Sequence, residues 1–115
     1  MEKEKRMTVK EFFDFFQISS EYIYYIYFTK NFKKDLKKCF KRNLDLSLLA
    51  NIVHILAKGK VLDEIYKVHK LEGYSQKSGT VLECHIQPDW LLIWVLNKNQ
   101  LTLTLTDTGT HSDLF

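Results

Sequence analysis

The spacing of apolar and polar positions divides the chain into helical and strand-forming stretches. Between Thr29 and Lys58, apolar residues recur every three or four positions, which is the period of a helix with one buried face. From about Val81 to Thr106, short apolar runs are separated by turn-forming residues, as is typical of strands. An almost continuous aromatic and β-branched run from Tyr22 to Phe28 precedes both stretches and predicts a well-covered first strand.

Two helices are predicted in the first of these stretches. One begins at Thr29, and its apolar stripe consists of Phe32, Leu36, Cys39 and Phe40. The other runs from Asp45, a good N-cap, to Lys58, and Gly59 stops it. Its expected buried positions are Leu48, Leu49, Ile52, Val53 and Leu56. Together the two helices form a hairpin that covers one face of a sheet.

The rest of the chain supplies that sheet. The expected pieces are, in order, a weak strand at Tyr66 to Leu71, a loop at Gly73 to Gly79, a strand from Val81 to Gln87 that ends at Pro88, and a hairpin of Leu91 to Leu96 and Leu101 to Thr106. This order predicts an α+β fold, with a small, mostly antiparallel sheet of four to five strands and the two-helix hairpin on one face. The other face is left open.

Residues 1–20 are predicted to form an extension before a domain of residues 21–115. A short amphipathic helix is expected from about Thr8 to Gln17, with apolar positions at Val9, Phe12, Phe13 and Phe16. These side chains either pack against the domain itself or contact a partner. Polar residues, including Asp14, interrupt the apolar stretch before it reaches the roughly 18 residues of a membrane span, so neither a span nor a secretory signal is predicted.

Composition narrows the class of protein. A chain of 115 residues with 45% hydrophobic content forms one ordinary domain with its own core. Cys39 and Cys84 lack the paired spacing of a disulfide framework or a zinc knuckle, which favours a reducing, cytoplasmic setting. The basic residues are unevenly spread: the segment from Thr29 to Arg42 has a local excess, with only Asp35 against Lys30, Lys33, Lys34, Lys37, Lys38, Lys41 and Arg42. This segment indicates either an anionic partner or a solvated helix face.

The candidate chemistry lies in two strings, Glu83 to Trp90 and Gly109 to Phe115. Alternation along neighbouring strands can bring His85, Asp89, Trp90 and His111 to one side of the sheet, although the period alone does not fix which face they share. Histidines in one concave site can give and take protons near neutral pH and so cleave RNA through its 2′-hydroxyl without a metal. A half-formed metal site is the alternative, but Cys84 would point away from His85, which weakens zinc.

Three stretches carry a resemblance to a known family: Phe28 to Lys38, Glu83 to Ile93 and Thr108 to Phe115. Over about Tyr22 to Phe115, the chain resembles the YafQ branch of the RelE/ParE toxin superfamily. The resemblance implies a RelE-like fold and a cytoplasmic, cofactor-free and metal-independent endoribonuclease that cuts mRNA on the ribosome. It also implies a cognate RelB/DinJ-like antitoxin, with operator DNA bound only as the complex.

The resemblance also assigns site residues. By position, His69, His85, Asp89 and His111 match the acid–base residues of the family, with Trp90 and Phe115 lining the site. Lys33, Lys34 and Lys37 are the expected substrate-binding lysines, and the basic segment has two uses open to it, ribosomal RNA and the antitoxin. No metal ligands are implied.

Two positions depart from the family pattern. Leu82 and Asp107 stand where the family usually has arginine. An arginine clamps a phosphate with two hydrogen bonds, and losing one such contact costs about 2 to 4 kcal/mol of transition-state stabilisation. The alternative function is therefore a catalytically weakened homologue that acts mainly as an antitoxin-binding module. A superfamily relative that acts on another target is the third hypothesis.

Overall fold

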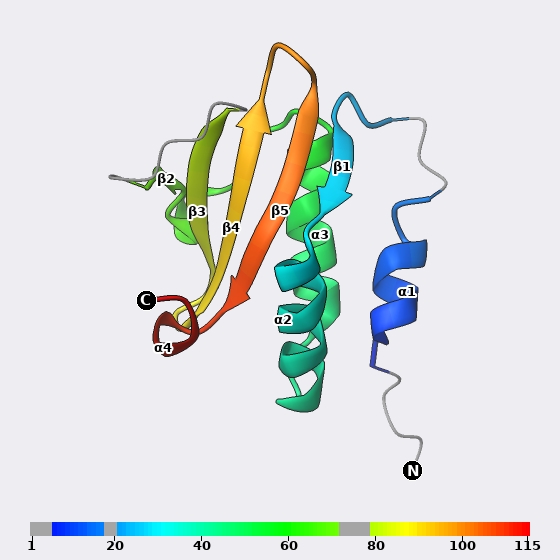
Figure 1. The fold of residues 1–115 in the computed structure, drawn as a ribbon, viewed down its shortest axis with the longest axis vertical. Helices are drawn as coiled ribbons and strands as arrows, with labels where there is room; N and C mark the ends of the chain where they lie inside the picture. The colour runs from blue at the N-terminus through cyan, green and yellow to red at the C-terminus, as the bar shows by residue number, and fades with distance from the viewer. Residues whose placement is uncertain (1–5, 18–20, 72–78) are drawn as a thin grey trace.

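A mixed five-stranded sheet forms the centre of the molecule (Figure 1). The computed structural model describes residues 6–17, 21–71 and 79–115, so most of the loop predicted at Gly73 to Gly79 lies outside the described residues. Along the chain the elements are α1 (Val9–Asp14), β1 (Tyr25–Phe28), α2 (Lys30–Lys41), α3 (Leu46–Ala57), the 3₁₀ helix η1 (Glu64–Tyr66), β2 (His69–Lys70), β3 (Thr80–Gln87), β4 (Trp90–Asn97), β5 (Thr102–Gly109) and α4 (His111–Leu114).

The strands lie in the order β1-β5-β4-β3-β2. The pairs β2–β3, β3–β4 and β4–β5 are antiparallel, and only β1 runs parallel to its neighbour, β5. The predicted α+β class and mostly antiparallel sheet are confirmed. The strand β5 extends to Gly109, beyond the Thr106 end predicted from the sequence, and so carries the chain directly into α4.

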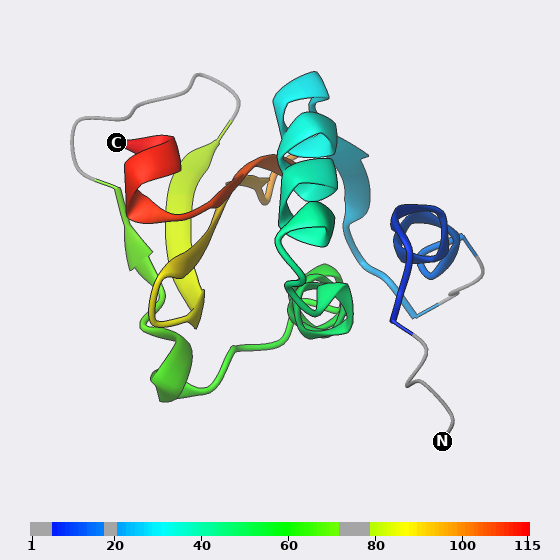
Figure 2. The same cartoon turned by 90° about the horizontal axis from the view of Figure 1, so that it is seen from below.

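Helices α2 and α3 cover one face of the sheet, as predicted (Figure 2). Each begins at the predicted cap: the Thr29 side chain accepts the Phe32 N–H at 3.0 Å, and the Asp45 carboxylate accepts the Ser47 N–H at 3.0 Å. The main core lies between the helices and the sheet, and its sheet residues include Cys84, Ile86, Leu92, Trp94, Leu103 and Leu105. One expected buried position is wrong, since Leu48 turns outward and is 39% exposed.

The first strand is shorter and less covered than predicted. Only Tyr25–Phe28 is a strand, and Tyr25 and Tyr27 are 73% and 54% exposed. The residues just before β1 bond to α3 instead of to the sheet, because the backbone N–H groups of Ile23 and Tyr24 donate to Ala57 O at the end of α3. Successive side chains of β1 point to opposite faces of the sheet, so Ile26 and Phe28 pack against the main core, while the exposed Tyr25 and Tyr27 point to the other face.

Helix α1 packs against the rest of the chain. Thr8 caps it in a capping box with Glu11. Phe12 is fully buried, with its ring centroid 6.1 Å from that of Phe28 and 6.0 Å from that of Phe32. The sequence left open whether these side chains pack against the domain or contact a partner. The Phe12 side chain packs in the core of the same chain. The division between residues 20 and 21 stays a prediction.

The opposite face of the sheet is only partly covered. A small second cluster there contains Val81, Ile93 and Val95, and Leu71 and Leu114 pack against it. The short helix α4 thus lies against the open face, at the end of the strands where β5 finishes (Figure 1). Among the described residues, no helix has both the length and the apolar composition needed to cross a membrane.

The position of Phe12 yields a test of whether α1 belongs to the same cooperative unit as the sheet. Replacing Phe12 by Ala empties a fully buried site, and such truncations destabilise proteins by about 3 to 5 kcal/mol. We expect a loss of this size in the free energy of unfolding by urea. Phe15→Ala, on the exposed side of the same segment, is the control and is expected to cost less than about 1 kcal/mol. Equal, small effects of the two changes would contradict a cooperative α1.

Candidate active site

Two turns meet at one end of the open sheet face and bring three predicted residues together. Asp89 lies in the turn between β3 and β4, His85 lies near the end of β3, and His111 opens α4. The pairing of the strands explains the meeting, because Leu91 on β4 lies opposite His85 on one side and Gly109 on the other. The sheet register therefore places His85, Asp89 and His111 in one cluster.

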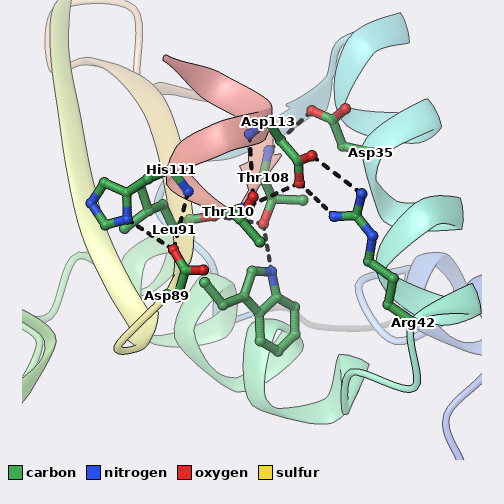
Figure 3. A network of polar contacts seen from close by, with 9 residues as sticks. Asp35, Arg42, Asp89, Leu91, Thr108, Thr110, His111 and Asp113 are labelled. Atoms are coloured by element: carbon green, nitrogen blue, oxygen red, sulfur yellow. Dashed lines mark hydrogen bonds and ion pairs between the residues drawn. The ribbon is translucent and has the colours of Figure 1, made fainter.

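Asp89 holds His111 by two hydrogen bonds (Figure 3). Its Oδ1 atom accepts the backbone N–H of His111 at 3.2 Å and lies 2.9 Å from the ring Nδ1. These bonds from His111 lower the pKa of the Asp89 carboxyl. Because an ionised carboxylate only accepts hydrogen bonds, the proton on Nδ1 points to Asp89, and Nε2 is the nitrogen that remains for a substrate.

His85 lies beside His111, with ring centroids 5.8 Å apart. Its Nδ1 is 3.3 Å from the carbonyl oxygen of Pro88, which also only accepts. Each imidazole therefore donates through Nδ1 to an acceptor of the β3–β4 turn and presents Nε2. Two such rings side by side form a pair that can remove one proton and deliver another in the same reaction.

His69 lies on the same face but is held differently. Its Nδ1 is 2.9 Å from the Lys67 carbonyl oxygen, and its Nε2 is 3.3 Å from the Glu83 carboxylate, so both ring nitrogens are occupied. Glu83 is buried, and its second oxygen has no hydrogen-bond partner among the described residues. Sequence reasoning missed Glu83, although alternation along β3 places it on the same face as His85.

Trp90 does not line the site, contrary to the prediction from the sequence. Its side chain is 1% exposed and lies in the main core, so it is not available to stack on a base. Its Nε1–H donates to the Thr108 hydroxyl at 2.9 Å, and that hydroxyl donates to Leu91 O at 2.7 Å. Trp90 is instead a buried support beneath the cluster.

A groove of about 410 Å³ lies on the other side of α4. Its apolar floor is the second cluster, and its walls come from α2, β5 and α4; the polar and aromatic lining residues are Asn31, Lys34, Asp35, Lys38, Thr106, Asp107, Asp113 and Phe115. Phe115 is 59% exposed, so its ring is accessible from solvent. None of the three histidines lines this groove, and α4 is the element that joins the two parts of the site.

The lysines of α2 are divided between two grooves. Lys34 and Lys38, one helical turn apart, line the groove beside α4. Lys33 and Lys37 line a separate groove of about 930 Å³ that is formed largely by aromatic residues of α1, β1 and the segment before β1. The expected trio of Lys33, Lys34 and Lys37 therefore does not share one surface. Lys38, which was predicted only as part of the basic segment, lies beside Lys34 because the tertiary position of α2 decides which lysines face α4.

The two departures from the family pattern lie on opposite faces of the sheet. Leu82 packs against the main core on the helix side, so a clamp at this position would not face the histidines, contrary to expectation. Asp107 does face the groove, near Asp35. Burial raises the pKa of Asp35, and the neighbouring negative charge of Asp107 adds to the rise, while the Thr108 N–H lowers it. The groove thus contains carboxylates as well as lysines.

Cys84 is buried on the helix side of β3, which confirms that it points away from His85. Burial raises the pKa of its thiol to about 12, and both cysteines are free. Within residues 6–17, 21–71 and 79–115, no group of three or more His, Cys, Asp or Glu side chains is arranged to hold a metal ion.

Comparison with known proteins gives consistent results. The family described as the bacterial toxin of type II toxin-antitoxin system, YafQ, matches residues 24–115. The mRNA interferase toxin YafQ of Escherichia coli strain K12 is 34% identical over 91 residues, which are 78% of this chain and 94% of that protein. The resemblance predicted from the sequence is confirmed. Helix α1 lies outside the matched residues.

Two solved structures share the fold. A chain of the E. coli DinJ-YafQ toxin-antitoxin complex is 33% identical, with a TM-score of 0.72, and the match covers 81% of this chain and 98% of that one. A metal-bound toxin from Helicobacter pylori is 41% identical, with a TM-score of 0.70, over 78% of this chain and 97% of that one.

The contact between Asp89 and His111 predicts a shifted titration. Because the folded state favours the ionised carboxylate, its stabilising effect is present above the unfolded-state pKa of 3.8 and is lost as the pH falls through the folded value. We expect carboxyl NMR to place the midpoint of Asp89 below 3.8, its ordinary value. His111→Ala should move the midpoint upward, whereas His69→Ala should not. If the midpoint of Asp89 were the same in His111→Ala as in the wild type, the contact between the two side chains would not be formed in solution.

Proposed function

Because this chain belongs to the YafQ family of toxins of type II toxin–antitoxin systems, we propose that it is an endoribonuclease that cleaves mRNA by acid–base catalysis. The observation that carries the proposal is the His85–His111 pair, 5.8 Å apart and oriented by the β3–β4 turn. Homologues named mRNA interferase toxin support a ribonuclease activity.

The reaction follows from the chemistry of the two rings. One imidazole removes the proton of the ribose 2′-hydroxyl, whose oxygen attacks the adjacent phosphorus. The second imidazole protonates the departing 5′-oxygen, so the bond from phosphorus to that oxygen breaks as the new bond forms. Asp89 keeps the His111 ring in one orientation and stabilises positive charge on it. No metal is required in this scheme.

The groove beside α4 is the proposed binding surface for the RNA backbone. Lys34 and Lys38 provide positive charge along one wall, and the exposed ring of Phe115 provides a surface on which a base stacks. His69 is proposed to hold the buried Glu83 carboxylate in place beside His85 through its Nε2, 3.3 Å away, and thus to support the site instead of transferring the proton itself. Leu82 does not support the alternative of a weakened homologue, because its side chain faces the core.

The partners follow from the family and from the charge of α2. A DinJ-like antitoxin is the proposed protein partner, since relatives of the same fold are found in DinJ-YafQ complexes. The substrate is proposed to be mRNA on the translating ribosome in the cytoplasm, with operator DNA bound only together with the antitoxin. Lys33 and Lys37, which face away from α4, remain available to an acidic antitoxin segment or to ribosomal RNA.

The decisive variants remove one ring at a time. His85→Ala and His111→Ala should each lower the rate of mRNA cleavage by about 100-fold or more, because each removes a proton-transfer group. The measurement uses purified protein and ribosomes programmed with a defined mRNA. His54→Gln is the matched control, since His54 lies on α3 and bonds to Tyr22 outside the site, and it should cleave like the wild type. Wild-type rates in both site variants would overturn the proposal.

A further inference from the structure

Helix α4 is too short to hold its own position. It has four residues, His111–Leu114, yet it carries His111 on one side of the site and leads to Phe115 on the other. Isolated helices of this length are not stable in water. The contact of Leu114 with the second cluster is apolar and does not fix the rotation of the helix. Other contacts must set where His111 and Phe115 point.

The strongest of these contacts comes from the end of α2. Arg42, the C-cap of α2, lies 71 residues before Asp113 and reaches it with both terminal nitrogens (Figure 3). The Nη1–Oδ2 distance is 2.5 Å and the Nη2–Oδ1 distance is 3.2 Å, so the pair is bidentate. Such a fork fixes direction as well as distance. The hydrogen bonds from Arg42 hold the pKa of the Asp113 carboxyl well below its usual range.

The same carboxylate also starts the helix. Asp113 Oδ2 accepts the Thr110 N–H at 2.9 Å, while the Thr110 hydroxyl accepts the Asp113 N–H at 3.2 Å. Gly109 allows this approach, because a Cβ atom there would lie 2.8 Å from Asp113 Oδ2. His111 is therefore fixed from two directions, by Asp89 on its own nitrogens and by Asp113 through the adjoining backbone.

We propose that Arg42 and Asp113 are positioning residues that lock α4 to α2. The lock keeps the His111 ring beside the His85 ring, and it keeps Phe115 beside the lysines of the groove. This inference rests on the proposed ribonuclease function. Although Asp113 also lines the groove, no contact among the described residues links Arg42 or Asp113 to the histidine rings, so the effect of the pair on proton transfer passes through α4. The pair sets the spacing between the proton-transfer rings and the wall that carries Lys34 and Lys38.

The kinetic test removes the fork and leaves the helix cap in place. Arg42→Gln keeps Asp113 as the acceptor for Thr110 and should lower kcat for cleavage of ribosome-bound mRNA about tenfold, with KM changed less than about twofold. Arg42→Lys keeps the charge without the bidentate geometry, so its kcat should lie between those of the wild type and Arg42→Gln. Lys60→Gln loses the same charge outside the basic segment and should match the wild type. The positioning role would be overturned if Arg42→Gln changed only KM, or if it changed neither kcat nor KM.

A structural measurement separates this inference from the proposed function. The Phe115 N–H donates to His111 O at 2.9 Å, so hydrogen exchange at Phe115 reports whether α4 is closed. Arg42→Gln should speed this exchange about tenfold or more over the wild type, whereas Lys60→Gln should not. If the wild type cleaves no RNA but the exchange changes as stated, the lock stands and the ribonuclease proposal fails. Unchanged exchange in Arg42→Gln overturns the lock whatever the activity.

Discussion

The site depends on the buried hydrogen bond from Trp90 to Thr108. An indole N–H in the core needs an acceptor, and the Thr108 hydroxyl supplies it at 2.9 Å while donating in turn to Leu91 O. The Thr108 N–H also donates to Asp35 on α2, at 3.2 Å. Strands β4 and β5 and helix α2 are thus joined at one point. Asp89 comes directly before Trp90 and His111 follows shortly after Thr108, so this junction brings the two together.

Much of this architecture could be predicted from local sequence patterns. The helix periods and the caps Thr29 and Asp45 predicted α2 and α3 with their buried stripes, because these features act within a few residues. The exposure of β1 was not predictable in the same way. Aromatic and β-branched residues suit both a fully covered strand and a strand with one exposed face, and the sequence pattern alone does not show that only one face of β1 is covered.

The site shows the same division between local and distant information. His85, Asp89 and His111 were predicted and are brought together, whereas Trp90 was assigned to the wrong surface because alternation does not fix which face is covered. The capping box of Thr110 and Asp113 is readable as a short motif. Its partner Arg42 is not, since no local pattern connects residues so far apart in sequence.

The groove beside α4 has mixed charge. Asp107 and Asp35 stand near Lys34 and Lys38, so part of the attraction for a phosphate is opposed by negative charge at the same surface. Leu82 has no such effect, because it packs toward the helices. In the proposed enzyme, the proton-transfer pair is complete and the phosphate-binding surface is the part that differs from the family pattern.

The most direct test of this account is the chemistry of the cut ends. Ribosome-bound mRNA of known sequence is treated with the purified protein, and both new termini are identified. The account predicts a 2′,3′-cyclic phosphate, or the 3′-phosphate formed from it, and a 5′-hydroxyl, because the 2′-hydroxyl is the nucleophile. A 3′-hydroxyl with a 5′-phosphate would mean that water attacks the phosphorus, and it would contradict catalysis by the His85–His111 pair as described.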